Sequence, residues 1–157
     1  MTYKHGPVEI RAAGPGDAAA LGPRLREADL AEVHLSGFPD GAAALAYGLA
    51  RSVEAWTLLI DGLPAAMFGL NPKTLMGSEA VVWLLGAPEL GRIKKTFMRL
   101  SPHIIAEWSR RFPVLYNLVP RDYAKSLAWL RWLGVNVDKP VTVDGQDWQL
   151  VAFARGS

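Results

Sequence analysis

The first third of the chain predicts one strand followed by helices. Apolar and polar residues alternate over Val8–Ala12, and the Gly/Pro-rich turn after it ends at Asp17, which is a residue type suited to capping a helix. Apolar residues then recur at helical spacing, with an expected break at Gly22-Pro23. The segment Ser36–Gly41 interrupts the pattern, and the Ala-rich segment Ala42–Ser52 predicts a further helix.

The middle of the chain predicts a β-hairpin and a third strand. The segments Trp56–Ile60 and Leu63–Gly69 flank Asp61-Gly62, a dipeptide typical of a two-residue type I′ turn. The run Ala80–Leu85 has too many consecutive apolar residues for a strand with one solvated face. We therefore expect it inside the sheet, with both faces covered.

The last part of the chain predicts alternating helices and strands. A long helix is expected from Glu89 or Leu90 to Phe112-Pro113, with a kink at Pro102. The remaining expected elements are a strand at Val114–Val119, a helix at Asp122–Leu133 with Gly134 just past its end, and strands at Val135–Val137 and Trp148–Phe153.

This order of elements predicts a mixed α/β layer structure. With 157 residues, half of them hydrophobic, the chain has the size of one ordinary domain. We expect a single domain spanning residues 1–157, without internal repeats.

The amino-acid composition excludes several classes of ligand and reaction. The formal charge of +2 is too small to imply nucleic-acid binding, and the absence of cysteine excludes thiolate chemistry and cysteine-based metal sites. The three histidines, His5, His34 and His103, are widely spaced, so no metal site is expected. No apolar run has the length of a signal peptide or a membrane span, which predicts a cytoplasmic protein without a membrane partner.

The segment Tyr123–Val135 resembles the late-helix pattern N-x-x-A/S-x-x-L-Y-x-x-x-G-F of the Gcn5-related N-acetyltransferase (GNAT) superfamily. Ser126, Trp129, Gly134 and Val135 occupy its small, apolar, glycine and apolar positions, whereas its first and eighth positions differ. The resemblance covers nearly the whole chain. It implies a mixed central sheet of about six to seven strands with helices on both faces, and transfer of an acetyl group from acetyl coenzyme A to an amine that the sequence does not identify.

Four short stretches resemble a subgroup of this superfamily that bacteriophages and prophages encode as internal virion, or core, proteins. They are Leu25–Val33, Ala66–Gly69, Trp83–Gly86 and Ser126–Gly134. This likeness implies a virion or host protein as a partner.

The resemblance also implies where the cofactor would bind. The pantetheine arm would lie along Trp83, Leu84 and Leu85, and the diphosphate would lie on the turn and helix start that contain Gly86, Ala87, Gly91 and Arg92. The spacing of these glycines departs from the superfamily loop Q/R-x-x-G-x-G/A, and Glu89 places an anion in it. The alternative is that the glycines only form a tight turn and that Arg92 belongs to a solvated face.

Acetyl transfer to an amine needs a base, and protonation of the departing thiolate often needs an acid. Glu32 is the preferred base, with Asp29 three residues earlier on the same helix face, where two carboxylates buried together would raise one another's pKa. A solvated acidic face is the alternative. The superfamily's tyrosine acid corresponds to Leu130, which has no proton to donate, so Tyr123 is a candidate acid or else a partly buried aromatic.

Two functions remain open at this point. One is an acyl-coenzyme A-dependent N-acetyltransferase with a degenerate cofactor loop. The other is a phage internal virion protein that kept the scaffold and lost catalysis, because a fold does not determine a function.

Overall fold

The computed structural model describes residues 2–73, 77–120, 136–143 and 146–154, with side chains described through Tyr116. The chain divides into two compact units. The first combines Met1–Asn71 with Trp83–Lys94, and the second combines Pro72–Val82 with Lys95–Ser157. Strand β5 (Glu79–Gly86) contributes its first half to the second unit and its second half to the first.

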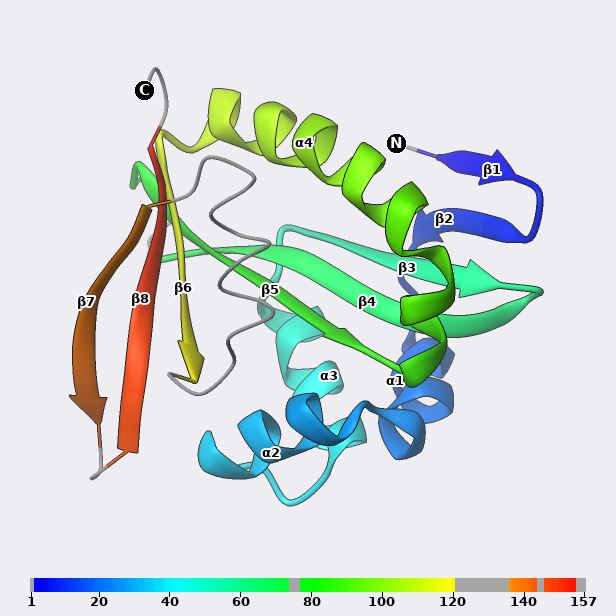
Figure 1. The fold of residues 1–157 in the computed structure, drawn as a ribbon, viewed down its shortest axis with the longest axis horizontal. Coiled ribbons are helices and arrows are strands. Elements are labelled where there is room, and N and C mark those ends of the chain that lie inside the picture. Colours follow the sequence, from blue (N-terminus) through cyan, green and yellow to red (C-terminus); the bar gives the residue numbers. More distant parts are fainter. Residues whose placement is uncertain (1, 74–76, 121–135, 144–145, 155–157) are drawn as a thin grey trace. The chain divides into compact units, whose positions relative to one another are not determined.

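The first unit is an antiparallel sheet with helices packed on it (Figure 1). Its strands pair in the order β1-β2-β3-β4, followed by the second half of β5. The strands are β1 (Tyr3–His5), β2 (Val8–Ala12), β3 (Glu54–Ile60) and β4 (Leu63–Pro72). The helices are α1 (Pro15–Leu21), α2 (Glu27–Leu35) and α3 (Gly41–Arg51), with 3-10 helices η1 (Gly22–Arg24) and η2 (Pro88–Ile93).

The second unit contains the long helix α4 (Lys94–Arg111) and the strands β6 (Val114–Pro120), β7 (Asn136–Val143) and β8 (Gln146–Ala154). The first half of β5 pairs with β6 in parallel, with Glu79–Val81 opposite Val114–Tyr116. Strand β8 lies between β6 and β7 and is antiparallel to both. The described residues thus form eight strands with both parallel and antiparallel pairs, and the predicted mixed α/β class is confirmed.

The predicted hairpin is confirmed. Ile60 pairs with Leu63, which leaves Asp61 and Gly62 as the loop. Both have positive φ, 51° and 81°, as a type I′ turn requires.

A buried cluster joins the helices of the first unit to its sheet. Its members are Ala18, Leu21, Leu25, Val33, Ala44, Leu45, Met67 and Ala87. Trp83 packs against it, and its indole lies so close to two glycines that a Cβ at Gly48 or Gly69 would be 3.2 Å or 2.7 Å from the ring. These two glycines therefore make room for the largest side chain of β5.

A second tight contact joins η1 to the start of α3. A Cβ at Gly22 would lie 2.4 Å from the backbone nitrogen of Ala42, and a Cβ at Gly41 would lie 2.4 Å from the carbonyl oxygen of Gly22. Real Cβ atoms do not approach backbone so closely, so this packing requires glycine at both positions.

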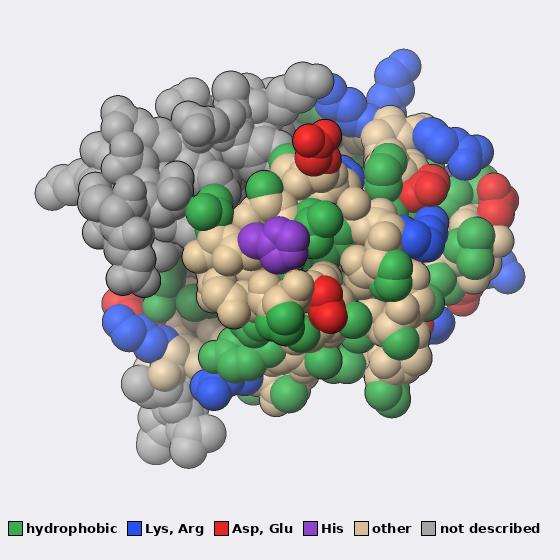
Figure 2. Space-filling view, turned by 90° about the horizontal axis from the view of Figure 1, so that it is seen from below, with side chains coloured by type: hydrophobic (Ala, Val, Ile, Leu, Met, Phe, Trp, Pro, Cys, Tyr) green, Lys and Arg blue, Asp and Glu red, His purple; other side chains and the backbone are tan. Residues whose placement is uncertain are grey.

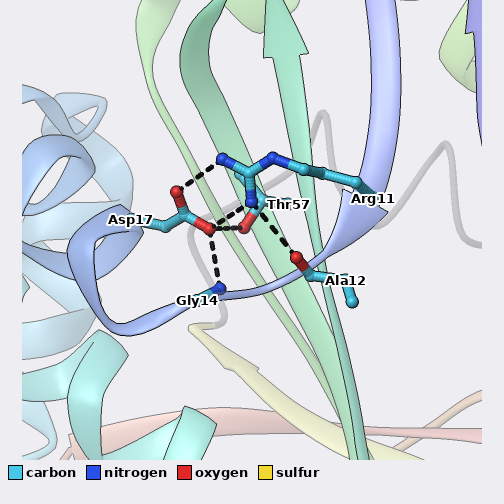
Figure 3. A network of polar contacts seen from close by, with 5 residues as sticks. All are labelled: Arg11, Ala12, Gly14, Asp17 and Thr57. Atoms are coloured by element: carbon cyan, nitrogen blue, oxygen red, sulfur yellow. Dashed lines mark hydrogen bonds and ion pairs between the residues drawn. The ribbon is translucent and has the colours of Figure 1, made fainter.

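A polar network holds the start of α1 against β2 and β3 (Figure 3). The Asp17 carboxylate accepts hydrogen bonds from Arg11 Nη1 at 2.8 Å and Nη2 at 2.9 Å, from the Gly14 N–H at 2.8 Å and from the Thr57 hydroxyl at 2.8 Å. Arg11 also donates to the Ala12 carbonyl. The prediction of Asp17 as the N-cap is wrong, because the helix begins two residues earlier and Gly14 is the cap. The carboxylate reaches back to it from inside the first turn.

Asp17 makes the stability of the protein depend on pH in acid. Burial opposes its ionisation, but the hydrogen bonds from Arg11, Gly14 and Thr57 outweigh burial and lower its pKa from 3.8 to about 2. Asp17 therefore contributes about 2 kcal/mol to the free energy of unfolding above pH 4, and this contribution is lost as the pH falls through 2. Urea unfolding of Asp17→Asn at pH 6 and pH 2 should show a loss at pH 6 that shrinks at pH 2. The exposed Asp61→Asn control should show neither effect, and an equal loss for Asp17→Asn at both pH values would contradict the linkage.

Several boundaries differ from the predictions. The α-helix α4 begins at Lys94, because the segment expected to open it, Pro88–Ile93, forms the 3-10 helix η2. Pro102 lies inside α4, which continues through it to Arg111. Strand β1 was not expected from the sequence, since its three residues are too few to show a period.

The run at β5 is a strand, as predicted, but complete burial is found only at Ala80 and Gly86. Val81–Leu85 are half-buried. An apolar run shows that the side chains on both faces of a strand can be buried. It does not show how far the neighbouring elements actually bury them.

The predicted helix at Asp122–Leu133, with Tyr123 and Gly134, lies outside the described residues. No helix in the described part of the chain combines the length and apolar character needed to cross a membrane.

Candidate functional site

The candidate site is built where α2 meets the end of β5, within the first unit. Gly86 donates its N–H to Asp29 Oδ2 at 2.8 Å and accepts a hydrogen bond from the N–H of Arg26 at 2.8 Å. The next residue, Ala87, donates instead to the Ala65 carbonyl of β4 at 2.7 Å. Because strand residues alternate in direction, the polar groups of Gly86 point away from β4. At Gly86 this edge of β5 is therefore occupied by the first turn of α2.

Asp29 is held from a second side by Arg26. Its Oδ2 also accepts from Arg26 Nε at 2.9 Å and Nη2 at 2.7 Å, and the residue is only 1% exposed. A carboxylate so deeply buried needs both a cation and hydrogen-bond donors, and Arg26 and Gly86 supply them. Asp29 is therefore a fixed negative charge on α2.

Glu32 lies one turn further along α2, on the same face as Asp29. It is half-buried, and no described side chain donates a hydrogen bond to its carboxyl group. Burial raises its pKa from 4.5 to about 8, the negative charge of Asp29 adds to the rise, and Arg26 opposes it. Glu32 therefore holds its proton at neutral pH and releases it in mild alkali, as a group that exchanges protons with an amine should.

The turn after β5 contains a negatively charged residue, Glu89. Glu89 lies near the start of η2, and its Oε2 is 3.2 Å from Arg24 Nη2. Arg24 is itself held by donating from Nη1 to the Pro64 carbonyl at 2.8 Å. The hydrogen bond from its own backbone N–H lowers the pKa of Glu89, and Arg24 and Arg92 lower it further against the opposing effect of partial burial. This carboxylate is charged at neutral pH.

The residues predicted to hold a cofactor fall into four groups. The side chains of Trp83 and Leu85 pack against the buried cluster, and the Trp83 indole N–H donates to Ser52 Oγ at 2.8 Å. Gly86 and Ala87 are buried at the end of the strand. Gly91 and Arg92 are exposed. Only the backbone of Leu84, two residues before Gly86, presents its N–H and C=O to the same edge as Gly86.

The structure joins Asp29 directly to Gly86, and Glu32 lies one turn after Asp29 on the same helix. Tyr123, the candidate acid, lies outside the described residues. Arg26 was not predicted to take part in the site. The spacing Arg26-x-x-Asp29, at which two residues of a helix start face each other, is the signal that would have indicated it.

Two further classes of ligand can be considered from the described residues. Among them, no three His, Cys, Asp or Glu side chains gather in a way that could hold a metal ion. On the face shown in Figure 2, the described surface carries acidic and basic side chains interspersed among apolar ones. This part of the surface does not form the single-signed field that nucleic acids favour.

No protein-family model and no curated protein sequence matches the chain. Solved structures do match it over nearly its whole length. The ribosomal-protein-S18-alanine N-acetyltransferase from Escherichia coli is 20% identical, with a TM-score of 0.66 over 94% of this chain and 93% of that one. A GNAT-family acetyltransferase from Bacillus anthracis is 9% identical, with a TM-score of 0.69 over 98% of both chains. The chain has the GNAT fold.

A third match carries a ligand. A putative acetyltransferase from Salmonella typhimurium, solved with its cofactor acetyl-CoA, is 15% identical, with a TM-score of 0.64 over 95% of this chain and 94% of that one. The GNAT scaffold predicted from the late-helix pattern is thus confirmed as a fold. The finer likeness to phage virion proteins finds no support among these structures, which are all acetyltransferases by name.

Proposed function

We propose that the protein is an acyl-coenzyme A-dependent N-acetyltransferase with weak affinity for the coenzyme. The observation that carries this proposal is the placement of Glu32 on the GNAT scaffold. Glu32 is half-buried with its pKa raised to about 8, and Asp29 ties its helix to the last residue of β5. By resemblance, β5 is the strand along which acetyltransferases of this fold hold the cofactor. This arrangement supports Glu32 as a proton acceptor, because its helix is tied to the strand that would carry the acyl group.

Glu32 serves as the base in this proposal. Acetyl coenzyme A supplies an activated acetyl thioester. An amine attacks as the neutral base, so its proton must leave as the C–N bond forms and the C–S bond breaks. Glu32 accepts that proton, and the same proton balances the thiolate when it is released to it through solvent. An acid among residues outside the described part is not required for this balance.

The residues of this chain suit the pantetheine arm of the coenzyme better than its diphosphate. The backbone of Leu84 presents a donor and an acceptor to the edge of β5, which suits an amide-rich arm such as pantetheine. The diphosphate is less well served, because the charged Glu89 lies in the turn where it would dock and uses the local N–H for itself. Arg24 and Arg92 are the cations nearby that would attract phosphate, and Glu89 partly neutralises both.

Replacing Glu89 with Gln should tighten the binding of acetyl coenzyme A about two- to fivefold at low salt. Removing one anion at a helix start is worth about 0.3 to 1 kcal/mol. Calorimetric titration of both proteins with acetyl coenzyme A measures the change. Glu9→Gln on β2 removes the same net charge at another position of the first unit and should leave the dissociation constant unchanged.

Three outcomes of this titration would count against the proposal. Submicromolar binding by the unmodified protein would contradict the weak site. An equal gain from Glu9→Gln would show that only net charge matters. The absence of heat for both proteins at millimolar ligand would refute cofactor binding.

The second candidate is a non-catalytic binding protein on the same scaffold, such as a phage virion or host-directed protein. It is favoured by the same two features that weaken the cofactor site, the occupied edge at Gly86 and the anion at Glu89. The titration separates the two candidates. For either candidate we place the protein in the cytoplasm of the cell that makes it or, if a phage encodes it, in the virion.

A further inference from the structure

Arg26 and Asp29 belong to a clamp that spans 57 residues of sequence between Asp29 and Gly86. Two hydrogen bonds join the start of α2 to Gly86. The backbone N–H of Arg26 donates to the carbonyl of Gly86, and the backbone N–H of Gly86 donates to Asp29. The Arg26 guanidinium then closes the ring by donating to the same Asp29 oxygen from Nε and Nη2. The first turn of α2 is therefore fixed to the end of β5 in both position and orientation.

We propose that the Arg26–Asp29 pair is a positioning device for Glu32: it fixes the helix that carries Glu32 on β5, and it holds two opposite charges at a set place beside its carboxyl group. The inference rests on the proposed function for its catalytic meaning. The effect of the Arg26 and Asp29 charges on the Glu32 carboxyl group does not depend on whether the protein is an enzyme. Neither Asp29 nor Arg26 needs to touch the substrate.

The charges around Glu32 have opposite effects on it. Asp29, on the same helix face, disfavours the charged form of Glu32, and Arg26, at the helix start, favours it. On helix α3, which packs against α2, the Arg51 guanidinium lies 4.6 Å above the centre of the Tyr47 ring. The pKa of Glu32 responds to burial and to the two charges of the clamp, Asp29 and Arg26.

Two successive substitutions in the clamp should move the pKa of Glu32 in opposite directions. Asp29→Asn keeps an oxygen that can accept the hydrogen bonds and removes the negative charge, so the pKa of Glu32 should fall. Arg26→Gln is then made in the Asp29→Asn background, where it removes the positive charge without leaving a buried carboxylate unpaired, so the pKa of Glu32 should rise again. A clamp that acted only by holding the helix would weaken at each step and would shift the pKa of Glu32 in the same direction at both, or not at all.

The test is an NMR titration of the side-chain carboxyl carbons of the full chain between pH 5 and pH 10. The resonance missing from the spectrum of Glu32→Gln identifies Glu32. We expect its midpoint to move at least half a pH unit down in Asp29→Asn and to move back up when Arg26→Gln is added to Asp29→Asn. Arg26→Lys retains the charge without the planar fork and should restore a midpoint close to that of the unmodified protein.

Shifts of the same sign at the two steps, or no shift in the folded Asp29→Asn variant, would overturn the inference. Thermal unfolding of each variant shows which are folded, and a downward shift in Asp29→Asn beside an unchanged midpoint in Arg26→Lys carries the test if the double variant is not. Because the titration needs no substrate, its result stands even if acetyltransferase activity is absent. If activity is present, the midpoint of the pH–rate profile should move with the NMR midpoint, a change that a merely structural role would not produce.

Discussion

Gly22→Ala is expected to lower the free energy of unfolding by about 3 kcal/mol, because a single methyl group would enter backbone rather than a flexible side chain. The new Cβ would lie 2.4 Å from the nitrogen and 2.6 Å from the Cα of Ala42. Backbone at the start of α3 cannot move away without disturbing its cap, where Asp40 accepts a hydrogen bond from the Ala43 N–H at 2.8 Å. Urea unfolding followed by circular dichroism measures the loss.

Gly16→Ala is the matched control for this experiment. Gly16 lies in α1, is exposed, and has no atom within 4 Å of the position of a Cβ. Alanine there should stabilise the protein by about 0.5 to 1 kcal/mol, since it restricts the unfolded chain and favours helix. Equal stabilities of the two variants would show that the contact between η1 and α3 is not as close as the structure has it.

Glu32→Gln is expected to reduce the rate of acetyl transfer by roughly a hundredfold to ten-thousandfold at pH 9, the range over which a positioned base contributes. In the unmodified protein the rate should rise with pH through about 8, because the raised pKa of Glu32 keeps most of it protonated below that value. The glutamine variant should lose this rise. Single-turnover rates with a panel of primary amines between pH 6 and pH 10 measure both effects.

Glu27→Gln serves as the control, because Glu27 lies on the same helix with an exposed side chain. Its rate and pH profile should match those of the unmodified protein. A Glu32→Gln variant with full activity and an unchanged pH profile would remove Glu32 from the mechanism and return it to the solvated acidic face that the sequence also allowed.

The sequence by itself determined the features that depend on near neighbours in the chain. The Asp61-Gly62 turn needs two residues that tolerate positive φ, and both have it. The strand at Val8–Ala12 was predicted with its observed bounds, and the apolar run at Ala80–Leu85 was predicted within one residue at each end. Period and turn chemistry act over a few residues, so they can be read without knowledge of the fold.

The sequence also placed the candidate base correctly on a helix face, with Asp29 one turn before it. The preference for Glu32 over Asp29 did not rest on their spacing. Spacing alone makes Asp29 and Glu32 equivalent, whereas in the structure one is a fully bonded ion and the other is a half-buried group with a raised pKa. The difference comes from Gly86, which no local pattern connects to α2.

The tertiary structure alone decided the contacts that join distant parts of the chain. Asp17 was expected as a cap because it follows a turn, and its binding of Thr57, 40 residues away, became visible only in the fold. Glu89 was expected to oppose a phosphate, and the fold added Arg24 as its partner. Burial and the proximity of charges set the state of an ionisable group, and both depend on which elements meet in space, a property that no window of sequence contains.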